Sequence, residues 1–320
     1  MTNIQKHEIL TTIIKEISRL GSANKVAVKC GVSSATLSNI INANWSAISV
    51  EMWQKVAAAL DINFTGWQLA ETGDFKRVTN VIKDAKKEKL FLAISNPAGS
   101  GKSAVSNYYR DNNFNNAVYY ISAREWARRE FLMNLAKNLG INTADLHQNS
   151  VDTLGSKVIE FFEKRASYNP VLIIDEADKL KPPAFRFLIP FFNSLEDKVG
   201  VVIIGTENLK KEIERGVRLK VKGYDELASR FGRRFIPLIG CKKTDLTKIA
   251  KVNGLEDNVI ITKIWNECEP NSKTVMIGND RIQIKVINDL RRVKRCIKRE
   301  LLNIRDKVNQ IEVVDVEEVS

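Results

Sequence analysis

Residues 96–103 read NPAGSGKS and end in the Gly-Lys-Ser triplet of loops that bind nucleotide phosphates. Gly99 and Gly101 permit positive φ angles, which turn backbone amides toward phosphate oxygens. Lys102 is expected to reach the β- and γ-phosphates, and Ser103 to offer its hydroxyl to Mg²⁺. The usual pattern begins with glycine where this chain has Asn96, and we interpret Asn96 as tolerated because asparagine accepts left-handed backbone geometry. The predicted ATP and Mg²⁺ site comprises Asn96, Pro97, Ala98, Gly99, Ser100, Gly101, Lys102 and Ser103.

A pair of acidic residues follows an apolar run further along the chain. The segment VLIIDEADKL places Asp175 and Glu176 after residues that predict a buried strand. Beside the phosphate loop, Asp175 would bind Mg²⁺ through water, and Glu176 would orient and activate the attacking water. Taken singly, the loop is compatible with a chance glycine-rich turn and the acidic pair with a solvated turn. Both signals in this order predict a site that hydrolyses a nucleotide.

Two further groups of polar residues adjoin strand-like runs. Thr206 follows the apolar part of VGVVIIGTEN, where it could contact the γ-phosphate or the attacking water, or begin a structural turn. Arg230, Arg233 and Arg234 lie in LASRFGRRFIPL, where arginines can stabilise transition-state charge on the nucleotide of a neighbouring subunit. A solvated basic turn or a DNA contact fits the same arginines equally well, so their role stays open.

The residues from 90 to 240 show an alternation that would position these groups. Apolar runs (LFLAIS, AVYYISA, PVLIIDEA, VGVVIIGTE and RFIPLIG) alternate with amphipathic helical stretches. Strands that are apolar throughout predict a parallel sheet with helices on both faces, hence an α/β fold. We expect an all-α segment at 1–65, a partly helical linker at 66–89, the α/β core at 90–240 and a helical segment at 241–320.

The first 65 residues contain the pattern of a helix-turn-helix. A helix over residues 23–30 is expected to end at Gly31, and Ser33 or Ser34 to cap a second helix that reaches about Ile41. The second helix would enter the major groove of DNA. A helical bundle that binds protein is the alternative. Asn39 is the one strong reader of base edges, which predicts weak sequence specificity. The predicted DNA-contacting residues of this helix are Ser34, Thr36 and Asn39.

Charge points toward a polyanionic partner. The formal net charge is +12 and the pI about 9.4, which favours nucleic acid over a membrane surface. The run LRRVKRCIKR near the end of the chain predicts a basic helix, whose cations would contact DNA phosphates or simply form a solvated surface. The predicted phosphate contacts are Lys294, Arg295 and Lys298.

Composition excludes several other classes. Hydrophobic residues make up 44% of the chain, which argues against wholesale disorder. The first twenty residues lack the features of a signal peptide, and no apolar run is long enough to span a bilayer. The four cysteines and two histidines show no zinc spacing. We therefore expect a cytoplasmic protein whose cysteines are buried and reduced.

With these residues identified, most of the chain resembles the AAA+ helper ATPases of DNA transposition, the family of the phage Mu B protein (MuB), to which the IstB and TnsC proteins are related. The resemblance rests on the helix-turn-helix, NPAGSGKS, LIIDEADKL, IIGTEN, SRFGRRF and the basic helix. It implies an AAA+ fold with a helical lid, and ATP-dependent, largely non-specific binding of double-stranded DNA by a homo-oligomer. It also implies recruitment and stimulation of a transposase, and ATP hydrolysis that leads to disassembly.

The resemblance also implies roles for individual residues. Lys102, Ser103, Asp175 and Glu176 match the two nucleotide motifs, Thr206 the polar sensor, and one of Arg230, Arg233 and Arg234 the inter-subunit arginine. Arg291 in NDLRRV is the candidate for a second sensor, although the glycine of the family's Gly-x-x-Arg pattern is absent.

Two other functions share these features. A helicase loader or replication initiator would have the same ATPase core, although stand-alone loaders often lack the amino-terminal segment. An ATP-dependent transcription regulator would use the helix-turn-helix to bind a specific operator. DNA binding with and without ATP on random duplex separates filament formation from recognition of a specific operator.

Overall fold

The computed structural model describes residues 3–60, 62, 66–113, 116–142, 150–277 and 280–317. The chain divides into two compact units. The sheet unit comprises Gly73–Lys243 and Ile264–Cys296. The helical unit comprises Met1–Thr72, Thr244–Lys263 and Ile297–Ser320.

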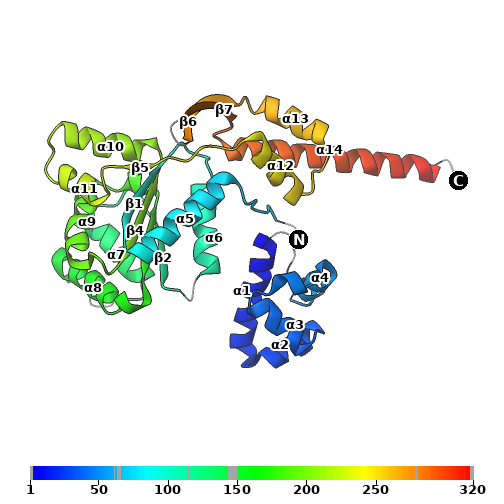
Figure 1. Ribbon diagram of the computed structural model, residues 1–320, viewed down its shortest axis with the longest axis horizontal. Coiled ribbons are helices and arrows are strands. Elements are labelled where there is room, and N and C mark those ends of the chain that lie inside the picture. The colour runs from blue at the N-terminus through cyan, green and yellow to red at the C-terminus, as the bar shows by residue number, and fades with distance from the viewer. Residues whose placement is uncertain are drawn as a thin grey trace. The chain divides into compact units, whose positions relative to one another are not determined.

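The sheet unit is built on a five-stranded parallel sheet in the order β2-β3-β4-β1-β5 (Figure 1). Its strands are β1 (Phe91–Ser95), β2 (Val118–Ser122), β3 (Val171–Asp175), β4 (Gly200–Gly205) and β5 (Phe235–Ile236). Its helices include α5 (Gly73–Glu88), α6 (Lys102–Asn112), α7 (Arg128–Asn138), α8 (Val151–Glu163), α9 (Pro182–Leu195), α10 (Glu207–Arg218) and α11 (Tyr224–Arg230), with 3-10 turns η2 (Ala166–Tyr168) and η3 (Ala177–Lys179). The predicted α/β fold, a parallel sheet flanked by helices, is confirmed.

Both faces of the sheet are buried, which explains the uninterrupted apolar sequence of its strands. In β3, Leu172 and Ile174 belong to the core formed with α7, α8 and α9. Val171 and Ile173 alternate with them and therefore point to the opposite face, where they are fully buried. Helices α5 and α6 pack against that face (Figure 1).

The register of the strands brings their carboxyl ends to one edge. Ser95, the last residue of β1, pairs with Gly205, the last residue of β4. Ser122, the last residue of β2, pairs with Asp175, the last residue of β3. Groups that directly follow β1, β3 and β4 therefore meet at this edge, where ligands of open α/β sheets bind.

The segment expected to be a linker contains a helix of the sheet unit. The sequence predicts a linker at 66–89, whereas α5 lies within the sheet unit. Val78, Ile82 and Ala85 form a buried stripe at helical spacing along it. The helix packs so closely that a Cβ added at Gly200 of β4 would collide with the carbonyl oxygen of Ala85. Because α5 also contains several lysines, its sequence suggests an exposed linker and not a helix with a buried stripe.

The segment after Gly240 is not helical throughout. It contains α12 (Lys243–Val252), α13 (Asn258–Glu267) and α14 (Leu290–Glu317), but also a hairpin of β6 (Asn271–Ile277) and β7 (Asp280–Val286). The prediction of a helical segment at 241–320 is therefore wrong for these strands. They alternate polar and apolar residues, as in DRIQIKV, and β7 is largely exposed. They thus lack the continuous apolar runs that predicted the buried strands.

The helical unit begins with α1 (Asn3–Leu20), α2 (Ala23–Cys30), α3 (Ser34–Ile41), η1 (Trp45–Ala47) and α4 (Val50–Ala59). Helix α2 ends at Gly31, which has a φ of 63°. The hydroxyl of Ser33 caps α3 by accepting a hydrogen bond from the amide of Thr36 at 3.0 Å. The fully buried Trp53 of α4 lies in the core that these helices share. The predicted bounds of α2 and α3 are confirmed, and their contact with DNA remains a prediction.

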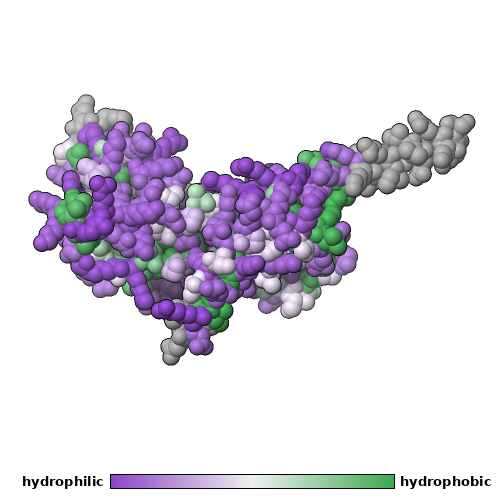
Figure 2. Space-filling model, turned by 90° about the horizontal axis from the view of Figure 1, so that it is seen from above, coloured by the Kyte–Doolittle hydropathy of each residue, from purple (hydrophilic) through white to green (hydrophobic). Residues whose placement is uncertain are grey.

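All four cysteines are buried, as expected of small apolar side chains, and none forms a disulfide with another described residue. Most residues on the face shown in Figure 2 are hydrophilic, with hydrophobic residues scattered between them. Within the part of the chain that the structure describes, no helix is long and apolar enough to cross a membrane.

Candidate nucleotide site

The phosphate loop connects β1 to α6 at the carboxyl edge of the sheet. Gly99 and Gly101 have φ angles of 83° and 85°, and α6 begins directly afterwards at Lys102. Both glycines are therefore in the left-handed region that side chains disfavour, as the sequence predicts. Ser103 lies exposed in the first turn of α6, whose free amides and dipole favour a phosphate group.

Asn96 fits the loop for a different reason from the one predicted. Asn96 is absent from the described residues that have a positive φ, so left-handed geometry does not explain it. Its side chain instead accepts a hydrogen bond from the amide of Leu238 (3.0 Å) and lies 3.3 Å from the carbonyl oxygen of the same residue, to which it donates. Asn96 thus joins the start of the loop to the segment after β5, a role that glycine could not fill.

Lys102 is held within the loop. Its ammonium donates to the carbonyl oxygens of Asn96 (2.7 Å) and Pro97 (2.9 Å) and to the hydroxyl of Ser100 (2.9 Å). Burial lowers the pKa of Lys102, against the raising influence of the nearby Asp175 carboxylate. A phosphate group would replace these uncharged partners with a charged one, which strengthens the hydrogen bonds of an ammonium.

The beginning of α14 lies on the phosphate loop. The amide of Leu290 donates to the carbonyl oxygen of Gly99 at 2.9 Å. A Cβ at Gly99 would collide with the carboxylate of Asp289, and one at Gly101 would lie 3.0 Å from Leu290. Arg291 follows directly and is exposed, and its charge contributes to the lowered pKa of Lys102. Asp289 and Leu290 are neighbours of the loop that the sequence did not predict.

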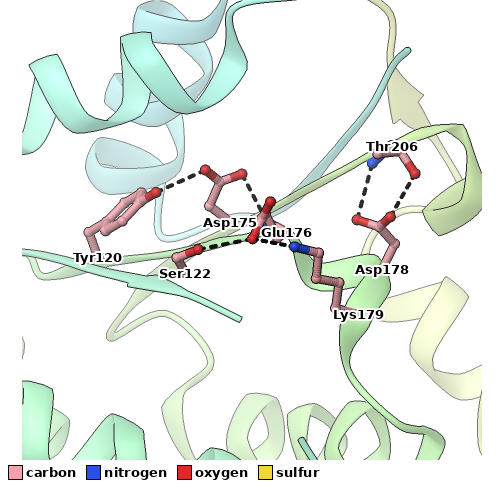
Figure 3. Close-up of polar contacts among 7 residues, drawn as sticks. All are labelled: Tyr120, Ser122, Asp175, Glu176, Asp178, Lys179 and Thr206. Carbon is pink, nitrogen blue, oxygen red and sulfur yellow. Dashed lines mark hydrogen bonds and ion pairs between the residues drawn. The ribbon is translucent and has the colours of Figure 1, made fainter. Parts of the chain in front are cut away.

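Asp175 ends β3, is buried, and lies near enough to Lys102 for its charge to act on that ammonium. Figure 3 shows its partners. One carboxylate oxygen accepts from the hydroxyl of Tyr120 at 2.9 Å, and the other from the amide of Glu176 at 2.8 Å. Burial, followed by the charge of Asp175, raises the pKa of Tyr120 well above its ordinary value. Tyr120 therefore stays protonated and donates to the Asp175 carboxylate, which it orients.

Glu176 has a left-handed backbone, with a φ of 53°. Its Oε2 accepts from the ammonium of Lys179 at 2.7 Å and from the hydroxyl of Ser122 at 3.2 Å (Figure 3). Ser122 lies at the end of β2 and Lys179 in η3, so Glu176 is held between two elements. The i,i+3 spacing of the acid and the lysine in EADK was the available signal for this ion pair.

Thr206 has a capping role in this structure. Its hydroxyl donates to Asp178 at 2.6 Å, its amide donates to the same carboxylate at 3.1 Å, and its Oγ1 accepts from the amide of Asn208 at 3.3 Å (Figure 3). Thr206 is thereby the N-cap of α10. Of the two interpretations of Thr206 that the sequence allows, the structural turn describes its contacts here, and contact with a phosphate remains a prediction.

The donors at this edge fit Mg²⁺ better than a transition metal. The Ser103 hydroxyl and the Asp175 carboxylate are hard oxygen ligands of the kind that Mg²⁺ takes together with substrate phosphates. Among the described residues, no cluster of three or more His, Cys, Asp or Glu side chains could hold a metal by itself.

The three candidate arginines differ in their surroundings. Arg230 donates to Asn193 at 2.6 Å and stacks on the ring of Phe192, with 4.6 Å from its guanidinium carbon to the ring centroid. Arg233 pairs with Asp225 at 2.9 Å. Arg234 is exposed and has no hydrogen bond or ion pair among the described residues. To contact a neighbouring subunit, the guanidinium of Arg234 therefore needs to break no hydrogen bond or ion pair with a described residue.

The predicted DNA-contacting residues lie on α3 and α14. On α3, Ser34 is exposed, while Thr36 and Asn39 are half-buried. On α14, Arg295 and Lys298 are exposed and Lys294 is half-buried. None of these positions is in a buried core.

Comparison with known proteins identifies the class of the central domain. A family model described as AAA domain matches residues 85–213. The matched region includes the phosphate loop, Asp175, Glu176 and Thr206. The chain therefore contains an AAA-type P-loop ATPase domain. A search of curated proteins found no match for the chain.

Proposed function

We propose that this protein is an ATP-dependent DNA-binding protein that assembles on target DNA, recruits and stimulates a transposase, and hydrolyses ATP to disassemble. The proposal rests on Asp175 and Glu176, which end and follow β3 at the same carboxyl edge of the sheet as the phosphate loop of an AAA domain, in a chain that also has a capped α2-turn-α3 pair. In this proposal the ATPase domain makes DNA binding depend on ATP. Helices α2 and α3 and the basic helix α14 supply the contacts with DNA.

In the proposed reaction, Lys102 and the loop amides bind the β- and γ-phosphates. Ser103 and Asp175 would hold Mg²⁺, which when bound would neutralise phosphate charge. Glu176 accepts a proton from the water that attacks the γ-phosphate. Tyr120 supports this arrangement because its hydrogen bond to Asp175 fixes the orientation of that carboxylate.

The surroundings of the arginines support assembly into an oligomer. Arg234 has an exposed guanidinium with no partner among the described residues, so it is available to reach the nucleotide of a neighbouring subunit. The site is then complete only between two copies, so hydrolysis depends on assembly. A net charge of +12 favours assembly on a polyanion, which offsets the repulsion between the copies.

DNA binding to two unrelated duplexes is measured by anisotropy, with ATP, ADP or no nucleotide, and assembly is observed by electron microscopy. We expect ATP-dependent assembly with similar affinity for both duplexes. Glu176→Gln keeps the shape of the side chain but loses the base, so it should bind ATP and remain assembled without turnover. Lys102→Ala should lose both ATP binding and assembly.

Two results would contradict the proposal. A strong preference for one duplex that survives high salt would favour an operator-specific transcription regulator. DNA binding that does not require ATP, together with hydrolysis by Glu176→Gln at the parental rate, would show that ATP does not control assembly on DNA. Recruitment of a transposase is tested separately, by strand transfer into DNA that already carries the ATP-bound protein.

A further inference from the structure

The hairpin of β6 and β7 (Figure 1) contains none of the residues assigned to the nucleotide site, and its two faces differ. In an antiparallel pair, directly opposite side chains point to the same side, and successive side chains of a strand alternate between the two sides. The register places Thr274 opposite Gln283, and residues two positions away on either strand share their side. Among the residues whose side chains the structure describes, this side, which we call the polar face, carries Ser272, Thr274, Arg281, Gln283 and Lys285.

The opposite face packs against the rest of the sheet unit. Val286 on this face is fully buried, and a Cβ added at Gly240 would lie 3.0 Å from its side chain. Lys273 on the same face donates to the carbonyl oxygen of Leu238 at 2.7 Å. Both contacts are with the segment that follows β5. The polar face is therefore the side of the hairpin that points away from this segment.

The polar face is exposed and positively charged. All five of its residues are exposed. The side chains of Arg281, Gln283 and Lys285 form no hydrogen bond or ion pair with a described residue. Asp280 supplies the only carboxylate of the two strands, and the register places it on the opposite face. Two cations thus lie on the polar face with no acid of the hairpin beside them on that face.

The dimensions of the hairpin suit the major groove of DNA. A strand rises about 3.4 Å per residue, so Arg281 and Lys285 lie about 14 Å apart with Gln283 between them. The major groove is about 12 Å wide and admits a two-stranded ribbon. The long side chains of the two cations would then reach phosphates at the sides of the groove, while Gln283 faces the base edges.

The chemistry of the polar face favours DNA over a protein partner. Arg, Lys, Ser, Thr and Gln are side chains that donate hydrogen bonds to phosphate oxygens. A protein–protein interface has an apolar centre that is enriched in aromatic residues, whereas these five side chains are all polar. Interfaces with DNA are more polar and more positively charged than those with proteins.

We propose that the polar face of this hairpin binds double-stranded DNA, with Arg281 and Lys285 contacting phosphates and Gln283 facing the groove between them. The inference rests on the proposed function and adds a third DNA-contacting element to α3 and α14. Because the opposite face is anchored to the segment after β5, the hairpin presents the polar face as a fixed surface.

The first experiment removes the two cations in the full chain, as Arg281→Ala with Lys285→Ala. Lys76→Ala with Lys83→Ala is the matched control, because it removes the same charge from exposed positions of α5. A third variant, Arg281→Lys with Lys285→Arg, keeps both charges. Binding of two unrelated duplexes is measured by anisotropy over a range of salt concentrations, with a non-hydrolysable ATP analogue present. The affinity for that analogue is measured for every variant, to show that the sheet unit is folded.

Loss of two phosphate contacts should flatten the log–log salt slope by about 1.8 for both duplexes. Between about 50 and 200 mM salt, the double alanine variant should therefore lose about 12-fold less affinity than the parent protein. The α5 control and the variant that exchanges the two cations should keep the parental slope. The affinity for the nucleotide analogue should stay at the parental value in all three.

The second experiment tests which face meets DNA. Gln283→Cys and Ile282→Cys place a thiol on adjacent residues of opposite faces, and Ile282 is 41% exposed, so both are accessible to a photo-reactive maleimide with a short linker. The four native cysteines are buried, and the parent protein reports their background labelling. Irradiation should cross-link DNA to the probe at position 283 and not to the probe at position 282.

An unchanged salt slope in the double alanine variant, or an equal change in the α5 control, would overturn the inference. Equal cross-linking of DNA from both positions, or cross-linking from position 283 to protein alone, would also overturn it. The cross-linking result decides by itself if the alanine variant fails to bind nucleotide. A parent protein that binds neither duplex would instead disprove the proposed function, and this result is obtained before any variant is compared.

Discussion

The side chain of Asn96 and the backbone of Leu238 share two hydrogen bonds across 142 positions of sequence. This pairing ties the first residue of the phosphate loop to the segment that follows β5. A second side chain holds the same segment: Asp74 accepts from the amides of Ile239 and Gly240, both at 2.8 Å. The loop is therefore positioned by its anchorage as well as by its glycines.

Replacing Asn96 should destabilise the sheet unit even when glycine, the residue of the usual pattern, takes its place. Asn96→Gly and Asn96→Ala both leave the buried amide of Leu238 without its partner, at a cost of about 1 to 3 kcal/mol. Chemical denaturation measures the change. Asn134→Ala is the control, because the side chain of Asn134 makes an exposed hydrogen bond within its helix and no other with a described residue. Parental stability of Asn96→Gly would show that the anchor is dispensable.

Gly99→Ala should abolish nucleotide binding. The new Cβ would collide with the Asp289 carboxylate, and the residue has a φ of 83°, so the Asp289 side chain or the loop must move. Gly140→Ala carries a similar backbone penalty at a φ of 71° but meets nothing within 4 Å, which isolates the clash. Calorimetric titration with ATP reports the effect.

The double variant Gly99→Ala, Asp289→Ala tests the origin of that loss. It should recover part of the ATP affinity, because the carboxylate that clashes is then absent. No recovery at all would assign the loss to the backbone of Gly99 rather than to its contact with the residue that precedes α14.

Of the three arginine variants, Arg234→Ala should lose the hydrolysis that depends on an arginine from a neighbouring subunit. The loss is expected to be on the order of 10³-fold, typical of an arginine that stabilises transition-state charge. A mixture of Arg234→Ala with Glu176→Gln should recover activity above the sum of the two, because each variant supplies what the other lacks. Absence of recovery in mixed assemblies would leave Arg234 as a surface or DNA-contacting residue.

Arg230→Ala should behave differently from Arg234→Ala. The guanidinium of Arg230 holds Asn193 and stacks on Phe192, so its loss should lower the free energy of unfolding by about 1 to 3 kcal/mol. Arg233→Ala removes only an exposed pair and should change stability by less than about 1 kcal/mol. Thermal denaturation separates the three variants before activity is compared.

The basic helix α14 should supply salt-dependent contacts with DNA. Each phosphate contact that is lost lowers the log–log salt slope by roughly 0.9, so the triple alanine variant should flatten it by up to about 2.7 and weaken two unrelated duplexes equally. The variant replaces Lys294, Arg295 and Lys298. Its control removes the same charge from exposed positions of α5, at Lys76, Lys83 and Lys87. An equal effect of the control would show that only net charge matters.

Features that depend on residues close together in the sequence could be predicted from the sequence alone. Apolar runs predicted the buried strands, because a strand covered on both faces has no polar side. Gly99 and Gly101 predicted the shape of the phosphate loop, because their φ angles are a local property. Asp175 and Glu176 lie at the end of β3, so their place at the edge of the sheet follows from the strand itself.

The partners of these residues emerged only with the folded chain. Leu238 meets Asn96, Asp289 meets Gly99, and Tyr120 meets Asp175 across long separations in sequence. The hairpin of β6 and β7 was likewise not predicted, because its strands alternate polar and apolar residues. The packing of α5 on the sheet was not predicted either, because a lysine-rich sequence suggests an exposed segment. A buried polar group must find a partner wherever folding brings one. Which group that is depends on strand order and helix packing, and a linear pattern contains neither.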